Sequence, residues 1–334
     1  MIDGRRTVVL VAGLVVLGAC SGSGSAGAPA TGSQQPSAPA TDPRRPSAPE
    51  PACADPPCYG AAETTARLSS DVVVEVSGTA ASGRVPGLYY VVGDEPGTSS
   101  VAVVRADGTP VTTLEIRGMD ARNAEALAVG PCGDGSAAGC LYVGDIGDHV
   151  GRDDVVVHRV PEPDLTEPPT SPVDSDVLRY TYPDGPTDAE ALLVDGQGRP
   201  LIISKAAFDR DSGETGPTRL YRGETGGGTL EAVGTVRLPE PEDGLLAGFV
   251  GNVVTGASAA DGRVLLRTYD EVLEFRAGAA DADVAGFPGW PVRRVPDGGL
   301  VQAESVAYRA DGCGYLTTSE LTGDVARVGC TSAP

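Results

Sequence analysis

The sequence is poor in positive charge, in aromatic side chains and in histidine. Its 334 residues carry 25 lysines and arginines against 46 aspartates and glutamates, which gives a net charge of −21. This balance argues against nucleic acid as a partner, because phosphates require a basic surface, and against direct binding to anionic lipid. Aromatic residues make up 4% of the chain, so a polysaccharide-binding surface built on aromatic platforms is disfavoured.

Several catalytic motifs are also absent from the sequence. The chain has two histidines, His149 and His158, so a Ser-His-Asp triad would have to use one of them. A GxSxG motif does not occur beyond the Ser- and Gly-rich N-terminal region, and neither a P-loop nor an HExxH motif is present. No standard hydrolase or nucleotide-binding site is therefore predicted.

Long apolar runs are missing except for one, from Val8 to Leu17. Arg5 and Arg6 precede this run, and Leu-Gly-Ala-Cys20 ends it. The run is too short to span a bilayer, which needs about 20 residues. A basic start, a short apolar segment and a small-residue cleavage site are typical of an export signal. The segment resembles bacterial lipoprotein signals, which implies that residues 1–19 are removed and that Cys20 becomes the lipidated first residue. The alternatives are an ordinary secretory signal with a chance cysteine and, on the Arg5-Arg6 pair, twin-arginine export.

Residues 20–59 are rich in Ser, Gly, Ala, Pro and Thr and hold almost no large apolar side chain. Such a segment cannot bury enough surface to fold, so we expect a disordered tether. The folded domain is then expected over residues 60–334. Together these segments predict an extracytoplasmic protein that is anchored to the cell membrane by lipid.

Six cysteines remain after Cys20, and they fall into three close pairs. An exported chain folds in an oxidising compartment, where disulfides persist. The competing explanation is a metal site, but zinc sites favour CxxC-like spacing with histidines, which this chain lacks. We therefore expect the disulfides Cys53–Cys58, Cys132–Cys140 and Cys313–Cys330.

The expected fold is an all-β propeller with five or six blades. Short runs rich in Val, Leu and Tyr alternate with Gly, Pro, Asp and Asn, which is typical of strands and turns. Five segments repeat a polar residue, a strand, a turn and a second apolar strand, at spacings that suit about four strands per unit. The last unit is one strand short, so an N-terminal strand near residues 64–74 is expected to close the ring. A β-sandwich is the alternative all-β fold.

The repeat places charged residues at equivalent points in each blade. The first strand of the five segments begins with Glu75, Glu125, Glu190, Thr255 and Glu304, and the second strand ends with Asp94, Asp145, Lys205, Arg267 and Glu320. Because the two strands are antiparallel, all ten should lie at one mouth of the central channel, with Asp148 and His149 in the following loop.

So many carboxylates around one opening require compensation. Calcium takes six to eight oxygen ligands and would compensate well, so Ca²⁺ is the predicted cofactor. Its predicted ligands are Glu75, Asp94, Glu125, Asp145, Asp148, Glu190, Glu304 and Glu320. Lys205, Arg267 and His149 are predicted to contact a bound ligand. The alternatives are carboxyl groups that stay protonated because their pKa is raised, and glutamates that only hydrogen-bond neighbouring blades.

Several stretches resemble an exported propeller family of high-GC bacteria, namely EVSGTAAS, NAEALAVG, LYVGDIGDH and DAEALLVD. Its usual pattern has Asn where this chain has His149, Trp-Glu where it has Asn123-Ala124, and an acid at Thr255. The C-terminal ESVAYRADGCGYLTTSE is similar to phytase-like propellers. That resemblance implies carboxylates that hold calcium, with phosphate bound to the metal.

The sequence therefore predicts a membrane-anchored extracytoplasmic scaffold that binds a ligand, a cation or a partner through its acidic channel mouth. The partner would be a protein or a small molecule. The alternative is a calcium-dependent phosphoesterase, in which Lys205 and Arg267 meet phosphate oxygens and a metal-bound water attacks.

Overall fold

The computed structural model describes residues 56–135, 139–242 and 244–332. The predicted signal peptide, the lipidation site Cys20, Cys53 and the tether up to residue 55 lie outside the described residues. Within them, no helix is long and apolar enough to cross a membrane.

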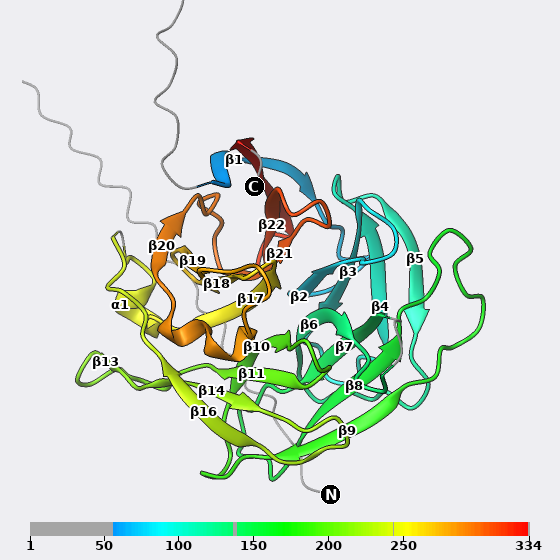
Figure 1. Ribbon diagram of the computed structural model, residues 1–334, viewed down its shortest axis with the longest axis horizontal. Helices are drawn as coiled ribbons and strands as arrows, with labels where there is room; N and C mark the ends of the chain where they lie inside the picture. The colour runs from blue at the N-terminus through cyan, green and yellow to red at the C-terminus, as the bar shows by residue number, and fades with distance from the viewer. Residues whose placement is uncertain (1–55, 136–138, 243, 333–334) are drawn as a thin grey trace, which may run out of the picture. The chain divides into compact units, whose positions relative to one another are not determined.

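Five sheets are arranged around a central axis, as Figure 1 shows, and they are the blades of a β-propeller. In each blade, antiparallel strands follow one another from the axis outwards. Blade 1 contains β2 (Val76–Ala81), β3 (Leu88–Gly93), β4 (Ser100–Arg105) and β5 (Pro110–Glu115). Blade 2 contains β6 (Ala124–Pro131), β7 (Gly139–Asp145), β8 (Val155–Pro161) and β9 (Asp176–Thr181). Its outer edge also pairs with β15 (Gly228–Thr229) in parallel.

The other three blades follow the same plan. Blade 3 contains β10 (Ala189–Val194), β11 (Pro200–Ser204), β14 (Thr218–Arg222) and β16 (Glu231–Val236), with a side hairpin of β12 (Phe208–Asp209) and β13 (Glu214–Thr215). Blade 4 contains β17 (Val254–Ala260), β18 (Arg263–Thr268), β19 (Val272–Arg276) and β20 (Val292–Val295). Blade 5 contains β21 (Ala303–Tyr308), β22 (Gly314–Ser319), β23 (Asp324–Ser332) and β1 (Cys58–Arg67).

The ring is closed by β1, the first described strand, which forms the outer edge of the last blade. It pairs antiparallel with β23, and Arg67 Nε lies 2.7 Å from Asp324 Oδ1. The prediction of an N-terminal closing strand is confirmed, but β1 begins at Cys58 and ends at Arg67 rather than covering 64–74. Valines 72–74 belong instead to the loop that leads into β2.

Each blade is covered on both faces by its neighbours, and this explains its sequence. Strands β3, β18 and β22 are buried along their whole length. The apolar side chains form clusters between successive blades, one of which packs Val101 and Val103 of blade 1 against Leu127 and Leu141 of blade 2. The only helices among the described residues are α1 (Ala247–Val250) and the 3-10 helix η1 (Val284–Gly289). The all-β propeller is confirmed with five blades, and the sandwich alternative is wrong.

Two of the expected disulfides are present. Cys132–Cys140 joins the ends of β6 and β7, and Cys313–Cys330 joins the start of the β22 hairpin to β23. The third pair includes Cys53, outside the described residues, so it stays a prediction. Disulfides persist in oxidising compartments, and these two indicate an extracytoplasmic domain.

Candidate functional site

The five innermost strands share one irregularity close to their first residue. In each, the pairing with the next strand skips the second residue, for example between Ala124 and Ala126 and between Ala189 and Ala191. Such a bulge turns one side chain out of the regular alternation of the strand. The five skipped residues, one from each blade, are Ser77, Glu125, Glu190, Thr255 and Glu304.

A chain of polar contacts links four of these positions, all except Thr255, across the blades. The Ser77 hydroxyl donates to Glu125 Oε2 at 2.5 Å and lies 3.4 Å from Glu304 Oε2. On the other side, the Tyr269 hydroxyl donates to Glu304 Oε1 at 3.3 Å and accepts a hydrogen bond from Lys205 Nζ at 3.0 Å. Lys205 Nζ also forms an ion pair with Glu190. The chain of contacts therefore visits all five blades and ends on two carboxylates, Glu125 and Glu190.

We call Glu125, Glu190 and Glu304 the mouth glutamates. Their exposed fractions are 3%, 3% and 5%, and Lys205 is bonded to one of them, Glu190. Burial raises the pKa of Glu125 and of Glu304 well above the usual value, and the negative charge of Glu190 raises both further. The protonated forms of these two carboxyl groups, which share the Ser77 hydroxyl as a neighbour, are therefore favoured.

Three more groups of this region, Glu190, Asp94 and Lys205, also have a raised pKa. Burial raises the pKa of Glu190 to about 7, although Lys205 opposes the rise. Burial also raises the pKa of Asp94 to about 7, with further contributions from Glu320 and Glu75. Burial disfavours the charged form of Lys205, but the carboxylate of Glu190 outweighs that effect and raises its pKa.

Three buried acceptor oxygens at this site have no hydrogen-bond partner among the described residues: Asp94 Oδ1, Asn123 Oδ1 and Glu190 Oε2. Two acceptor side chains also converge on Gly147. A β-carbon at that glycine would lie 2.2 Å from Asn123 Oδ1 and 2.7 Å from Glu125 Oε1. Unpaired buried acceptors are costly in a folded protein and point to a missing donor. The three oxygens belong to blades 1, 2 and 3, so a donor that reached them would contact three neighbouring blades.

The sequence-predicted residues divide into two groups. Six of them lie at the second residue of an innermost strand or directly after the second strand of a blade: Asp94, Glu125, Glu190, Lys205, Glu304 and Glu320. Glu320 accepts a hydrogen bond from Gln302 Nε2 at 3.0 Å, and the negative charge of Glu320 contributes to the raised pKa of Glu304. These six, with Ser77, Asn123 and Tyr269, form what we call the acidic mouth.

Glu75, Asp145, Thr255 and Arg267 take no part in these contacts, contrary to the expectation that ten residues share the mouth. The Thr255 hydroxyl donates to the carbonyl oxygen of Ala303 at 3.0 Å and lies 3.4 Å from that of Arg267. Glu75 is exposed with a φ of 50°, and Ser77 takes its place two residues later. Asp145 is buried in an ion pair with Arg152 at 2.7 Å. Arg267 is fully buried and donates to the carbonyl oxygens of Asp297 and Tyr269 at 3.1 and 3.3 Å. Successive side chains of a strand point to opposite faces, so a miscount of one residue redirects a side chain.

Asp148 and His149 were also predicted at the mouth, but their contacts lie within their own loop or in solvent. The Asp148 carboxylate accepts hydrogen bonds from the backbone N–H groups of Val150, Gly151 and Arg152, at 2.7 to 3.1 Å. It thereby shapes its own loop. The His149 side chain is exposed on that loop.

Three residues of the acidic mouth were missed by the sequence reasoning, namely Ser77, Asn123 and Tyr269. Ser77 and Tyr269 could have been found by pairing the residues of each hairpin outwards from its turn. Val76 pairs with Gly93 and Val254 with Thr268, which places Ser77 and Tyr269 at the positions of Glu190 and Lys205 in blade 3. Asn123 precedes its strand, and no signal in the sequence distinguishes it.

The acidic mouth contains no preformed group of metal ligands among the described residues. Among the described residues, no group of three or more His, Cys, Asp or Glu side chains is placed to hold a metal ion. The ammonium group of Lys205 is bonded to one of the three mouth glutamates. The calcium ion stays a prediction of the sequence.

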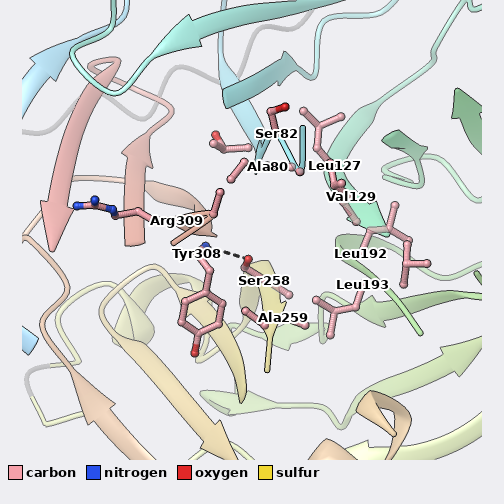
Figure 2. A pocket seen from close by; sticks show the side chains of 18 of the residues that line it. Ala80, Ser82, Leu127, Val129, Leu192, Leu193, Ser258, Ala259, Tyr308 and Arg309 are labelled. Carbon is pink, nitrogen blue, oxygen red and sulfur yellow. Dashed lines mark hydrogen bonds between the residues drawn. The ribbon is translucent and has the colours of Figure 1, made fainter. Parts of the chain in front are cut away.

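The opposite end of the innermost strands differs in chemistry. A cavity of about 270 Å³ lies there and is lined by all five innermost strands. Figure 2 shows its wall, with Leu127, Val129 and Leu192 on one side and Ala259 and Ser258 below. Asp261 is the one carboxylate among the residues that line this cavity, so the axis of the propeller has one acidic end and one end with little charge.

Two further buried glutamates, Glu162 and Glu274, lie between blades and away from the acidic mouth; we call them the interblade glutamates. Glu274 accepts hydrogen bonds from the hydroxyls of Tyr59 and Tyr308 at 2.5 and 2.8 Å. Its other oxygen accepts from Arg276 and Arg293 at 2.7 and 2.9 Å. Four donors thus join blades 4 and 5 through one carboxylate.

Glu162 joins blades 1 and 2 in the same manner. Its Oε1 accepts from the Ser82 hydroxyl at 2.7 Å, from the Gly83 N–H at 2.8 Å and from the Tyr90 hydroxyl at 3.1 Å. The locking role that the sequence allowed for repeated glutamates is thus seen at two residues outside the repeat.

Comparisons with known proteins add no family. No protein-family model and no curated protein matches the chain. Among solved structures, it is similar to a glucose dehydrogenase (12% identity, TM-score 0.45, 82% of this chain and 100% of that chain). It is also similar to virginiamycin B lyase from Staphylococcus aureus (10%, 0.41, 80% and 98%) and to Myxococcus xanthus glutaminyl cyclase (14%, 0.43, 83% and 100%). Likenesses this distant say nothing of activity, and the propeller rests on the strand topology.

Proposed function

We propose that this protein is a lipid-anchored, extracytoplasmic binding scaffold that takes up a cationic group at its acidic mouth. The observation that carries the proposal is the set of unpartnered buried acceptors, Asp94 Oδ1, Asn123 Oδ1 and Glu190 Oε2. Beside them, burial raises the pKa of Glu125 and of Glu304 and so favours protonated forms whose protons a cation would displace. A bound cation would supply both the missing donors and the missing charge.

The class of cation follows from two considerations. Calcium is the ion that the sequence predicts, and it would have to draw the mouth carboxylates together, because no ready-made group of three exists among the described residues. An ammonium or guanidinium group needs only hydrogen-bond acceptors, which the mouth already provides. We therefore place an organic cation first and calcium second.

The phosphoesterase alternative lacks support of this kind. Lys205 is bonded to Glu190 and Tyr269, and Arg267 is fully buried with its guanidinium on two carbonyl oxygens. Neither residue is free to meet a phosphate. Phosphoesterase activity is therefore measured only as one possible result of the binding experiment.

The anchor at Cys20 is part of the proposal. Acyl chains on that cysteine would hold the propeller at the outer surface of a membrane, since each buried methylene contributes about 0.8 kcal/mol. We expect Cys20→Ser to abolish labelling with a palmitate analogue and to move the protein out of the membrane fraction. Retention of both in that variant would contradict the anchor.

The binding test is a titration of the purified protein by calorimetry with lysine amide, with guanidinium and with Ca²⁺. We expect an organic cation to bind with release of protons, so the heat should depend on the ionisation enthalpy of the buffer. Glu190→Gln should abolish binding, whereas Glu115→Gln, at an exposed residue of β5, should leave it unchanged. Absence of binding by all three cations would contradict the proposal. Calcium-dependent hydrolysis of p-nitrophenyl phosphate would favour the alternative.

A further inference from the structure

Exposed apolar side chains are concentrated on one face of the propeller. Of the eight large apolar residues that are exposed in the described part of the chain, six lie in loops at the acidic end of the blades. These loops either lead into an innermost strand or connect the second and third strands of a blade. The six residues are Val74, Val150, Leu245, Phe249, Val301 and Leu321. We call them the apolar rim; Val177 and Val292, on outer strands, are the other two.

Half of the rim residues lie within three residues of the acidic mouth along the chain, with Val74 before Ser77, Val301 before Glu304 and Leu321 after Glu320. Leu321, 64% exposed, follows Glu320, and Val74 precedes Glu75. Val301 precedes Gln302, whose side-chain amide donates to Glu320. Apolar and acidic groups therefore alternate over the loops of blades 5 and 1.

A second part of the rim is held by the short helix α1. Leu245 and Phe249 are 72% and 68% exposed. The Asp270 carboxylate accepts hydrogen bonds from the N–H groups of Leu246 and Ala247 at 3.0 and 2.7 Å. Asp270 directly follows Tyr269 of the acidic mouth, so these exposed side chains sit on a loop that is tied to the mouth.

We infer that this face docks a polypeptide segment in which a lysine or arginine is flanked by apolar residues. The basic side chain enters the acidic mouth and donates to Glu190 Oε2, while the flanking residues cover the apolar rim. The inference rests on the proposed function, and it adds the identity of the molecule that carries the cation. Buried arginines are among the residues that contribute most to binding at protein interfaces, where surrounding contacts exclude water from them.

Charge decides between a polypeptide and a lipid surface. The chain carries a net charge of −21, and the rim surrounds carboxylates, so an anionic bilayer would be repelled. A basic peptide is attracted by the same charges. The docked molecule is therefore taken to be a protein segment, and membrane binding becomes an outcome of the test.

The first experiment selects ligands from a phage-displayed library of random nonapeptides on the purified protein. We expect the selected peptides to share a lysine or arginine with apolar residues on either side. A synthetic peptide of that sequence should lose affinity about tenfold or more when the basic residue becomes norleucine, and again when the flanking residues become serine. A selection that yields no basic residue, or no common sequence, would overturn the inference.

Paired variants assign the contacts to this face. The double variant Val301→Ser, Leu321→Ser should weaken the synthetic peptide about tenfold and leave the binding of lysine amide unchanged. The control Val177→Ser, Val292→Ser removes side chains of outer strands that are 45% and 40% exposed, against 54% and 64% for Val301 and Leu321, and it should change neither. Equal effects of both double variants would contradict docking on the rim. If lysine amide binds but flanking residues contribute nothing, the docking inference fails while the proposed function stands.

The lipid alternative is tested with the Cys20→Ser chain, so that no acyl group contributes. Vesicles of phosphatidylcholine with phosphatidylglycerol are sedimented with this protein. We expect no cosedimentation. Cosedimentation that is lost in the Val301→Ser, Leu321→Ser variant would replace the polypeptide by a membrane surface.

Discussion

The interblade glutamates and the mouth glutamates are equally buried but differ in their hydrogen-bond partners. Glu274 is fully buried and meets two tyrosine hydroxyls and two arginines. Glu190 is 3% exposed, meets Lys205 alone and leaves one oxygen unpartnered. A buried charge is tolerated when donors surround it, and otherwise it takes up a proton.

This difference separates a structural role from the binding role that we propose. The interblade glutamates lie where two blades already provide donors, so nothing is left for a ligand to add. The mouth glutamates lie on the axis, where five strands converge and the donors are too few. Burial alone therefore does not indicate function, whereas burial with unpartnered oxygens does.

The largest effect is expected from removing an interblade carboxylate. Glu274→Gln leaves Arg276 and Arg293 facing an amide, and breaking a buried ion pair typically lowers the free energy of unfolding by about 3–5 kcal/mol. Glu304→Gln should change it by no more than about 1 kcal/mol, because burial raises the pKa of Glu304 and the amide resembles the protonated carboxyl group that is thereby favoured. Urea denaturation at pH 7 measures both, and similar losses would erase the distinction between the two classes.

The next effect is the pH dependence of stability. The pKa of Glu190 and of Asp94 rises to about 7, so the folded state binds these protons more tightly than the unfolded state does. Their contribution is complete below the unfolded pKa, near pH 4, and is lost as the pH rises through 7. We expect the free energy of unfolding to fall between pH 5 and pH 8, by up to about 3 kcal/mol for Glu190.

Denaturation over this pH range provides the measurement. The decrease in the free energy of unfolding with rising pH should become smaller in Asp94→Asn. It should remain unchanged in Glu115→Gln, whose side chain is exposed on β5. A free energy of unfolding that increases from pH 5 to pH 8 would mean that the mouth carboxylates are ionised in the folded state.

A smaller effect is expected from the lysine of the mouth. Lys205→Met deprives Glu190 of its ion pair, but the carboxylate can take up a proton, which limits the loss at pH 8 to about 2 kcal/mol. At pH 5 the loss should nearly disappear. The double variant Lys205→Met, Glu190→Gln should recover most of the stability, and a double-mutant cycle measures the coupling. Additive losses would indicate that the two side chains do not interact.

The smallest effect concerns Ser77, which donates to Glu125. Ser77→Ala should lower the free energy of unfolding by about 1 kcal/mol, the usual contribution of one hydrogen bond. The loss should be smaller at pH 5 than at pH 8, since a protonated Glu125 needs no donor. Chemical denaturation at the two pH values gives the comparison, and a loss that grows at low pH would contradict the raised pKa of Glu125.

Much of the fold followed from local features of the sequence. The apolar runs, the turn residues and the five repeats predicted a propeller, because these signals depend on the chain within one blade. The near pairs of cysteines predicted two disulfides that the structure contains, and the incomplete last repeat predicted the closing strand. The closing strand was placed six residues too late in the chain, because valines 72–74 are as apolar as a strand but form a loop.

The site was predicted less completely, and the reason is register. Glu125, Glu190 and Glu304 begin their strands at the same position, so the repeat located them correctly at the start of the innermost strands. Asp145 and Arg267 were assigned by the same count, but the bulge and the turn shift each by one or two residues. A strand exposes alternate faces, so this small error sends one side chain into an ion pair and the other into the core.

The sequence by itself determined the blades, the export context and the concentration of negative charge, because each is a property of consecutive residues. Only the tertiary structure decided which carboxylates have donors and which do not. That distinction depends on strands from different blades meeting at the axis, over separations such as the 227 residues between Ser77 and Glu304. Hydrogen-bond satisfaction is a property of the assembled ring, and no single repeat contains it.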